Sequence, residues 1–219
     1  MELNIKETLR FYDERNLVNS KHVSAITGLI GEDFAIAVFC HYLRSIGLSV
    51  TPRNEPCTEG KKKGKWLDKW LFVEKENNNW LFQVEVKNWS AHSIGGIHLS
   101  LDATEEQIKE AKKKAWLQQW DEINQRFRDP GVDKVLLVMR SPLPNCKVKP
   151  LVIFWFAIHP TGDSAPLFEV KVNNEFERLF VFSVSSYLRS LAFETIEIDI
   201  PRVEERLSII KRLFNNSFC

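Results

Sequence analysis

The segment 65–89 contains two carboxylates and a lysine, side chains able to bind a metal ion and to activate a water molecule. Residues 66–74 and 80–87 are rich in aromatic and β-branched residues, which favour strands, and the asparagine-rich segment between them favours a turn. Side chains alternate between the two faces of a strand, so Glu85 and Lys87 share one face. The sequence therefore predicts a hairpin with Glu85 and Lys87 side by side.

Asp68 joins this pair in two of the registers open to the hairpin. When Asp68 lies opposite either Glu85 or Lys87, the three side chains are cross-strand neighbours, whereas a slip of one residue moves Asp68 to the other face. Two carboxylates supply hard oxygen ligands for a divalent cation such as Mg²⁺, and a lysine beside it holds or polarises a water. The alternative interpretation is a half-exposed surface with solvated residues and cross-strand ion pairs.

Glu32 lies in a helix that is expected to start near residue 20 or 24, or only at about Leu29 if Gly28 and Gly31 interrupt it, and to stop at Gly47. It occupies the start of the apolar stripe of this helix, which continues through Ile36, Phe39 and Leu43. A carboxylate on a core-facing stripe is costly unless a positive or hydrogen-bonding group meets it. The alternative is a solvated residue in the first helical turn, favoured by the helix dipole, and Asp33 fits that description better.

Two groups of lysines flank these elements. One group, in the loop before Asp68, comprises Lys61, Lys62, Lys63 and Lys65; the other lies on a helix predicted over 103–128 and includes Lys112 and Lys113. Such lysines usually belong to a solvated loop or helix face. Beside a metal site they would contact phosphates, so both groups are candidate nucleic-acid-binding residues.

The remaining elements predict an α/β fold with a mixed central β-sheet flanked by helices. The continuous apolar runs 134–139 and 151–159 are typical of strands in the middle of a covered sheet. Edge strands are expected at 179–183 and 196–200. Further expected elements are strands at 48–53 and 167–172 and helices at 3–16, at 103–128 (capped by Asp102 or Thr104), at 185–191 and from Pro201 onward.

Composition indicates a single compact domain over 1–219. A net charge of +1 gives no overall attraction to nucleic acid or membrane, so any nucleic-acid binding must come from local clusters. The four cysteines are far apart and match neither a zinc site nor a disulfide framework. The N-terminus has no signal-peptide pattern, and the apolar run 151–158 is too short to span a bilayer. The sequence predicts a cytoplasmic protein without membrane contact.

The order of these features resembles the PD-(D/E)XK nuclease superfamily. The resemblance rests on Gly31-Glu32 in a helix, Leu67-Asp68 on a strand, and Glu85-Val86-Lys87 on the next strand, followed by a helix and a strand. It covers about residues 20–158. The chain departs from the pattern at Leu67, where the family name has proline. The resemblance implies a restriction-endonuclease-like core with a C-terminal strand and helix extension over about 159–219.

The resemblance also implies a role for each matching residue. Asp68, Glu85 and the backbone carbonyl of Val86 would bind Mg²⁺ or Mn²⁺, and Lys87 would position the attacking water. Glu32 would complete the metal shell directly or through a water. In some branches of the family a glutamine on the following helix lies beside the site, which makes Gln107 an accessory candidate.

The expected function is metal-dependent hydrolysis of DNA phosphodiester bonds, in restriction, defence or repair; RNA as a substrate stays open. A second possibility, from another class, is a nucleic-acid-binding or assembly module on the same fold with little catalysis. A third is an unrelated α/β protein whose hairpin is solvated surface. The region after about residue 160 has no chemical motif, and target recognition, a homodimer and a partner subunit are all open roles for it.

Overall fold

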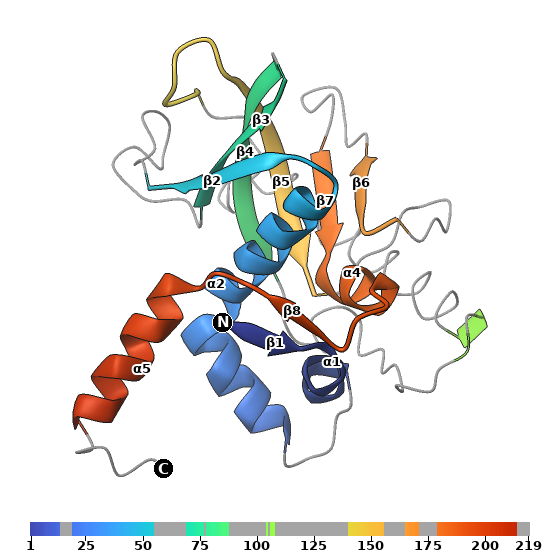
Figure 1. The fold of residues 1–219 in the computed structure, drawn as a ribbon, viewed down its shortest axis with the longest axis vertical. Helices are drawn as coiled ribbons and strands as arrows, with labels where there is room; N and C mark the ends of the chain where they lie inside the picture. The colour runs from blue at the N-terminus through green and yellow to red at the C-terminus, as the bar shows by residue number, and fades with distance from the viewer. Residues whose placement is uncertain are drawn as a thin grey trace, which may run out of the picture.

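The computed structural model describes residues 1–13, 19–54, 69–76, 78–87, 104, 106–107, 140–155, 165–170 and 179–213. Within these ranges the chain is a mixed α/β protein with a six-stranded sheet of order β2-β3-β4-β5-β7-β6 (Figure 1). Neighbouring strands are antiparallel except for the parallel pairs β4–β5 and β5–β7. This confirms the predicted fold class. The strands are β2 (Ser49–Arg53), β3 (Lys69–Lys75), β4 (Asn78–Lys87), β5 (Lys147–Phe154), β6 (Leu167–Val170) and β7 (Leu179–Ser183).

The helix α2 (Asn19–Ser45) crosses one face of this sheet, and its stop signal works as the sequence predicts. Gly47 has a φ of 80°, which glycine adopts without strain. Its N–H donates to the carbonyl of Arg44 at 3.0 Å, and the N–H of Leu48 donates to the carbonyl of Leu43 at 3.0 Å. These two bonds are a Schellman motif, which ends the helix and leads directly into β2.

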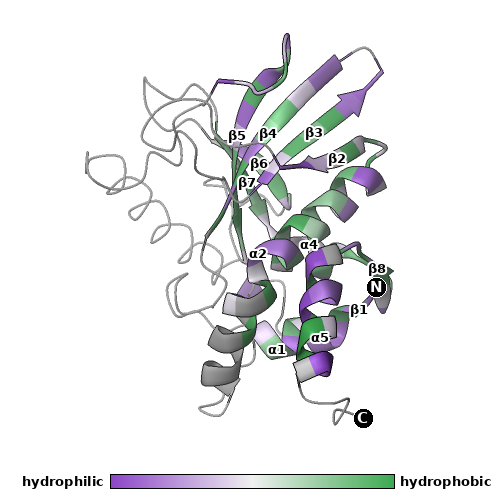
Figure 2. Ribbon diagram, turned by 90° about the vertical axis from the view of Figure 1, so that its left-hand side faces the viewer, coloured by the Kyte–Doolittle hydropathy of each residue, from purple (hydrophilic) through white to green (hydrophobic). Residues whose placement is uncertain are grey.

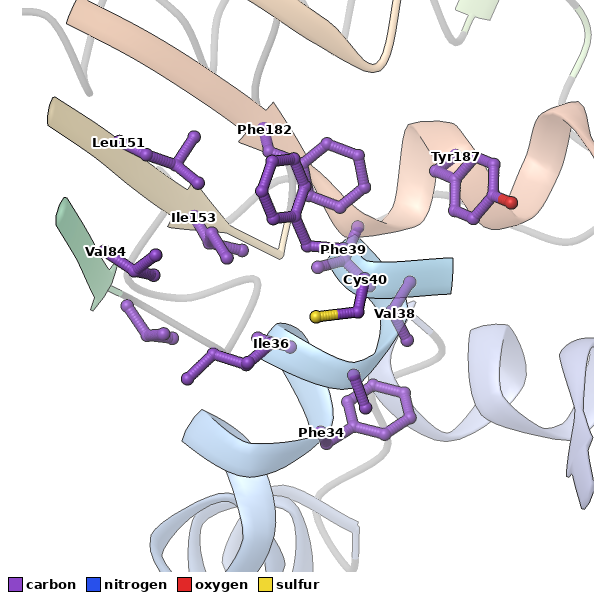
Figure 3. Packing of buried hydrophobic residues seen from close by; sticks show 14 of the residues in the cluster. Phe34, Ile36, Val38, Phe39, Cys40, Val84, Leu151, Ile153, Phe182 and Tyr187 are labelled. Atoms are coloured by element: carbon purple, nitrogen blue, oxygen red, sulfur yellow. The ribbon is translucent and has the colours of Figure 1, made fainter. Parts of the chain in front are cut away.

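The main hydrophobic core lies between α2 and the sheet. Phe39 of α2 is fully buried, with its ring centroid 4.8 Å from that of Phe182 on β7 and 5.5 Å from that of Phe82 on β4 (Figure 3). Residues 34–40 of α2 are all buried, so this part of the helix is covered on every side. Other members of the core on this face include Leu71, Val73, Val84, Val86, Leu151, Ile153 and Tyr187.

Three further helices and a second small sheet pack on the same side of the central sheet as α2 (Figure 2). The helices are α1 (Ile5–Asp13), α4 (Val184–Ser190) and α5 (Pro201–Leu213), and β1 (Glu2–Asn4) pairs with β8 (Thr195–Glu197). Ser183 caps α4 by accepting a hydrogen bond from the N–H of Ser186 at 3.3 Å. Pro201 starts α5, a position where its missing N–H costs nothing.

The C-terminal part of the chain is built into the central sheet. Strands β6 and β7, from the segment predicted as an extension, continue the same sheet as β2–β5. The prediction of an edge strand at 179–183 is wrong, because β7 lies between β5 and β6. The prediction for 196–200 is corrected as well, since β8 pairs with β1 outside the central sheet. The predicted strand at 134–139 lies outside the described residues.

The strand predicted at 151–159 starts earlier than expected, because β5 begins at Lys147 and contains Pro150. Proline is rare in the middle of a sheet since it cannot donate to the ladder. In β5 the pairing with β7 begins only at Leu151, so the described strand has a neighbour on one side alone at Pro150. This local edge position accounts for the proline.

Candidate functional site

The β3–β4 hairpin has one of the two registers that the sequence argument requires. Lys69 pairs with Val84 and Lys75 pairs with Asn78, so the connection consists of Glu76 and residue 77. Glu76 has a φ of 51°, the left-handed conformation that a two-residue hairpin loop uses. The asparagines were expected to supply this conformation, but at the described turn position a glutamate does so.

The two faces of β4 differ in character. Phe82, Val84 and Val86 face the main core beneath α2. On the other face Leu81 belongs to a small cluster with Trp70, and it is followed by two polar residues, Gln83 and Glu85, that are only 2% and 6% exposed. A buried carboxylate must be offset by hydrogen bonds or charge, so this face is chemically distinct from the core face.

The last residues of β4 are paired on one side by β5. Glu85 lies opposite Val152 and Lys87 opposite Phe154 in the parallel ladder. The described ladder with β3 ends two residues before Val86, at the Lys69–Val84 pair. Asp68, the partner expected on β3, lies outside the described residues, and for Lys87 the structure describes the backbone alone. Glu85 and the strand that carries Val86 and Lys87 are therefore the described part of the predicted site.

Glu32 has the angular position of the apolar stripe but is not buried, so the prediction that it faces the core is corrected. The residue is exposed, whereas Ile36, Phe39 and Leu43, at the same angular position, are at most 5% exposed. Continuous burial of the helix begins only at residue 34, so the stripe is still uncovered at Glu32. Glu32 also belongs to the helix that packs on the Val84 and Val86 face, and Glu85 lies on the other face.

Gln107 and Thr104 form a capping box at a helix start. The N–H of Gln107 donates to Oγ1 of Thr104 at 3.2 Å, and the N–H of Thr104 donates to Oε1 of Gln107 at 3.0 Å. Thr104 is thus the cap that the sequence offered together with Asp102. Gln107 is exposed and its side-chain oxygen serves this cap, a structural role that the sequence argument did not give it. The lysines of both predicted clusters, including Lys61, Lys62, Lys63, Lys65, Lys112 and Lys113, lie outside the described residues.

A second polar site lies on the α2 side, where the sequence argument placed none. A pocket of about 170 Å³ lies between α2, the ends of β2 and β3 that meet the segment 55–68, and the turn from β8 into α5. Its charged lining residues are Asp33, Arg44, Lys69, Asp199 and Arg202, and Ile36, Ala37, Cys40, Pro52, Asn54 and Ile200 complete it.

Ion pairs hold α5 against α2 at this pocket. Arg206 Nη1 lies 3.2 Å from Oδ2 of Asp33, and Arg202 Nη1 lies 3.7 Å from Oδ1 of the same carboxylate. The Asp33 side chain is only 14% exposed, against 50% and 39% for Arg202 and Arg206. Asp33, the neighbour of Glu32, therefore anchors α5 to α2.

Burial shapes the ionisation of the groups in the pocket. It lowers the pKa of Lys69 below its usual value, with a further contribution from the positive charge of Arg202. Nζ of Lys69 donates to Oδ1 of Asn54 at 2.6 Å. Burial raises the pKa of the Cys40 thiol to about 12, so this cysteine is a neutral wall of the pocket and not a nucleophile.

This pocket could not be predicted from the sequence, for a definable reason. Its residues come from segments far apart in the chain, and no spacing pattern connects Asp33 with Arg202. The sequence features that point toward it are Asp33 on one helix and Arg202 and Arg206 in the first turns of another. Opposite charges of this kind suggest that the two helices pair.

Whether the predicted metal-binding residues fit a divalent cation depends on the donor atoms that they offer. Within the described ranges no group of three His, Cys, Asp or Glu side chains gathers as a metal site would require. The oxygen donors that β4 offers, a nearly buried carboxylate and backbone carbonyls, are of the type that Mg²⁺ and Mn²⁺ prefer. Glu85 therefore fits the ion that the resemblance implies, with Asp68 needed as its second carboxylate.

Comparisons with models of protein families, with curated proteins and with solved structures gave no match to this chain. In the described part of the chain, none of the helices has the length and apolar character needed to cross a membrane.

Proposed function

We propose that this protein is a metal-dependent nuclease that hydrolyses DNA phosphodiester bonds. The observation that carries the proposal is the register of the hairpin, in which Lys69 pairs with Val84. One further step of the same register would place Asp68 opposite Glu85, the first of the two arrangements that put both carboxylates on one face. A register shifted by one residue would have removed this support.

The burial of Glu85 is the second support. The residue is 6% exposed, on the sheet face that carries Gln83 and not on the wet surface that the alternative interpretation requires. Solvated glutamates are rarely buried to this extent. A buried carboxylate at the end of a strand, beside a short apolar cluster, is suited to hold a divalent cation away from bulk water.

The proposed roles follow from the chemistry of phosphodiester hydrolysis. Mg²⁺ or Mn²⁺, when bound, supplies a Lewis acid and lowers the pKa of a bound water. Asp68, Glu85 and the carbonyl of Val86 would hold this ion, and Lys87 would orient the water and stabilise charge on the phosphate. The lysines of 61–65 and 112–113 would contact the DNA backbone. Glu32 has no part in this proposal because it is exposed and belongs to α2, which packs on the face of β4 opposite to Glu85.

The setting of the activity is part of the same proposal. The described cysteines Cys40 and Cys146 are free thiols, which supports a reducing compartment such as the cytoplasm. Restriction, defence and repair are the roles in which such an activity operates.

The test is cleavage of plasmid and linear DNA with Mg²⁺, Mn²⁺ or EDTA, with an RNA substrate in parallel. Wild type is expected to cut only when Mg²⁺ or Mn²⁺ is present. Asp68→Asn and Lys87→Ala are each expected to lower the cleavage rate on the order of a hundredfold. Lys75→Ala, an exposed lysine at the turn end of the same hairpin, is the matched control and should cut as wild type. Cutting that survives in both site variants would refute the proposal. A metal-independent shift of DNA in a gel without cutting would favour a binding module instead.

A further inference from the structure

The pocket at the junction of α2 and α5 has a composition that suits a ligand of a definite charge. Three cationic side chains, Arg44, Lys69 and Arg202, line it, against the two carboxylates of Asp33 and Asp199. The lining thus carries one net positive charge, which favours an anionic ligand. The pocket has a volume of about 170 Å³. Since ~10–15 Å³ of such volume is enough for one water molecule, the pocket accommodates a group of several heavy atoms.

The hydrogen-bonding capacity of this pocket is only partly used. Lys69 has three donors, and the partner described for it is the neutral amide oxygen of Asn54 at 2.6 Å. Within the described part of the chain, no carboxylate lies within ion-pair distance of Lys69 or Arg44, whereas Asp33 forms ion pairs with Arg202 and Arg206 of α5. The lysine is half-buried, and a half-buried ammonium is stabilised by an anion that replaces the water it has lost.

We propose that this pocket binds a phosphate group, either as free phosphate or as part of a nucleotide or polynucleotide. Lys69 would be the central donor, with Arg202 and Arg44 on either side, and Asp33 would fix the position of Arg202. Phosphate matches the size, the charge and the cationic donors of the pocket. The site lies on the α2 face of β3, because Lys69 precedes Leu71 and Val73 of the main core by two and four positions.

The connectivity of the chain places further cations next to this pocket in sequence. Asn54 and Lys69, both lining residues, bracket the segment 55–68, which carries Lys61, Lys62, Lys63 and Lys65. The lysine-rich segment therefore leaves and re-enters the described structure at the pocket.

The proposal is tested by calorimetry on the full chain in EDTA, so that no metal-dependent cleavage takes place. The probes are inorganic phosphate, a deoxynucleoside 5′-monophosphate with its nucleoside, and a short oligonucleotide with and without a 5′-phosphate. Binding of inorganic phosphate assigns the site to the free group. Binding restricted to the phosphorylated nucleotide or oligonucleotide assigns it to that source. Absence of binding by every phosphorylated probe would overturn the proposal.

Variants of opposite expected sign separate a phosphate site from a structural role. Lys69→Met is expected to weaken binding by about tenfold or more, because it removes a charge-assisted hydrogen bond. Asp199→Asn is expected to tighten binding several-fold because it removes the exposed carboxylate that repels the anion. Lys75→Met, on the same strand, is the control and should bind as wild type. Equal binding by Lys69→Met and wild type would also overturn the proposal.

The outcome does not depend on the proposed nuclease activity. Phosphate binding in EDTA with no cleavage under any metal condition would refute the nuclease and keep the pocket. Cleavage with metal together with no phosphate binding would refute the pocket and keep the nuclease.

Discussion

The two faces of the β3–β4 hairpin carry different kinds of side chain, and we assign them different roles. The face beneath α2 carries Leu71, Val73, Phe82, Val84 and Val86, which join the main core with the buried residues of the helices. The other face carries a small apolar cluster around Trp70 and Leu81 and then the buried polar pair Gln83 and Glu85. The first face holds the fold together. The second face carries the buried polar groups in which we place the chemistry.

The difference has a physical reason. A continuous apolar face stabilises by removing surface from water, about 25 cal/mol per Å², and gains nothing from a buried charge. A buried carboxylate costs stability. The presence of Glu85 at a strand end is therefore better explained by a functional role than by a contribution to packing. The same reasoning applies to Lys69, which lies at the margin of the core face and lines a charged pocket.

The largest effect on stability is expected from Phe39→Ala. Phe39 is fully buried and its ring packs against Phe82 and Phe182 from two strands. Truncation leaves a cavity and should lower the free energy of unfolding by about 3–5 kcal/mol, as measured by urea unfolding. Phe193→Ala is the matched control, since Phe193 is 68% exposed and its loss should change stability by about 0.5 kcal/mol or less. Similar losses in both variants would contradict the assignment of the core face.

A smaller, pH-dependent effect is expected from His41, on the outer side of α2. Its Nδ1 lies 2.7 Å from Oη of Tyr187 on α4. Burial, and then the charge of Arg44, lower the pKa of His41 below 6.5. As the pH falls below about 6.5 the unfolded chain takes up a proton at this residue while the folded chain resists it, so stability decreases; above that pH the contribution is constant.

The measurement is the free energy of unfolding of wild type and His41→Gln at about pH 7.5 and about pH 5.5. Acidification is expected to lower the free energy of unfolding less in the variant than in wild type. A loss of equal size in wild type and His41→Gln would show that the histidine titrates alike in both states.

Several elements of the fold follow from the sequence alone. Local backbone chemistry or a short apolar run is enough to predict each of them. They are the stop of α2 at Gly47, the strands at Ser49–Arg53 and Leu179–Ser183, and the start of α5 at Pro201. The register of the hairpin was limited to two options by the requirement that Asp68 share a face with Glu85, and the described ladder has the first of them.

Other features depend on contacts that no local pattern encodes. The position of β7 inside the sheet follows from which strands pair, and the pairing of β1 with β8 brings residues 2–4 beside residues 195–197. The expectation that Glu32 faces the core failed because the continuously buried part of α2 is limited to residues 34–40, and an apolar stripe does not mark where burial begins. The charged pocket was missed because Asp33 and Arg202 meet only in the folded chain.

The most direct test of the account is the binding of Mn²⁺ and Mg²⁺, by calorimetry, to wild type, Glu85→Gln and Glu74→Gln. Glu74 is an exposed carboxylate on the same hairpin, so Glu74→Gln is the matched control. The account predicts that wild type and Glu74→Gln bind the metal alike, while Glu85→Gln binds it about tenfold more weakly or worse and keeps its fold by near-ultraviolet circular dichroism. Equal metal affinity in all three proteins would contradict the claim that the Glu85 face of the hairpin is the metal site.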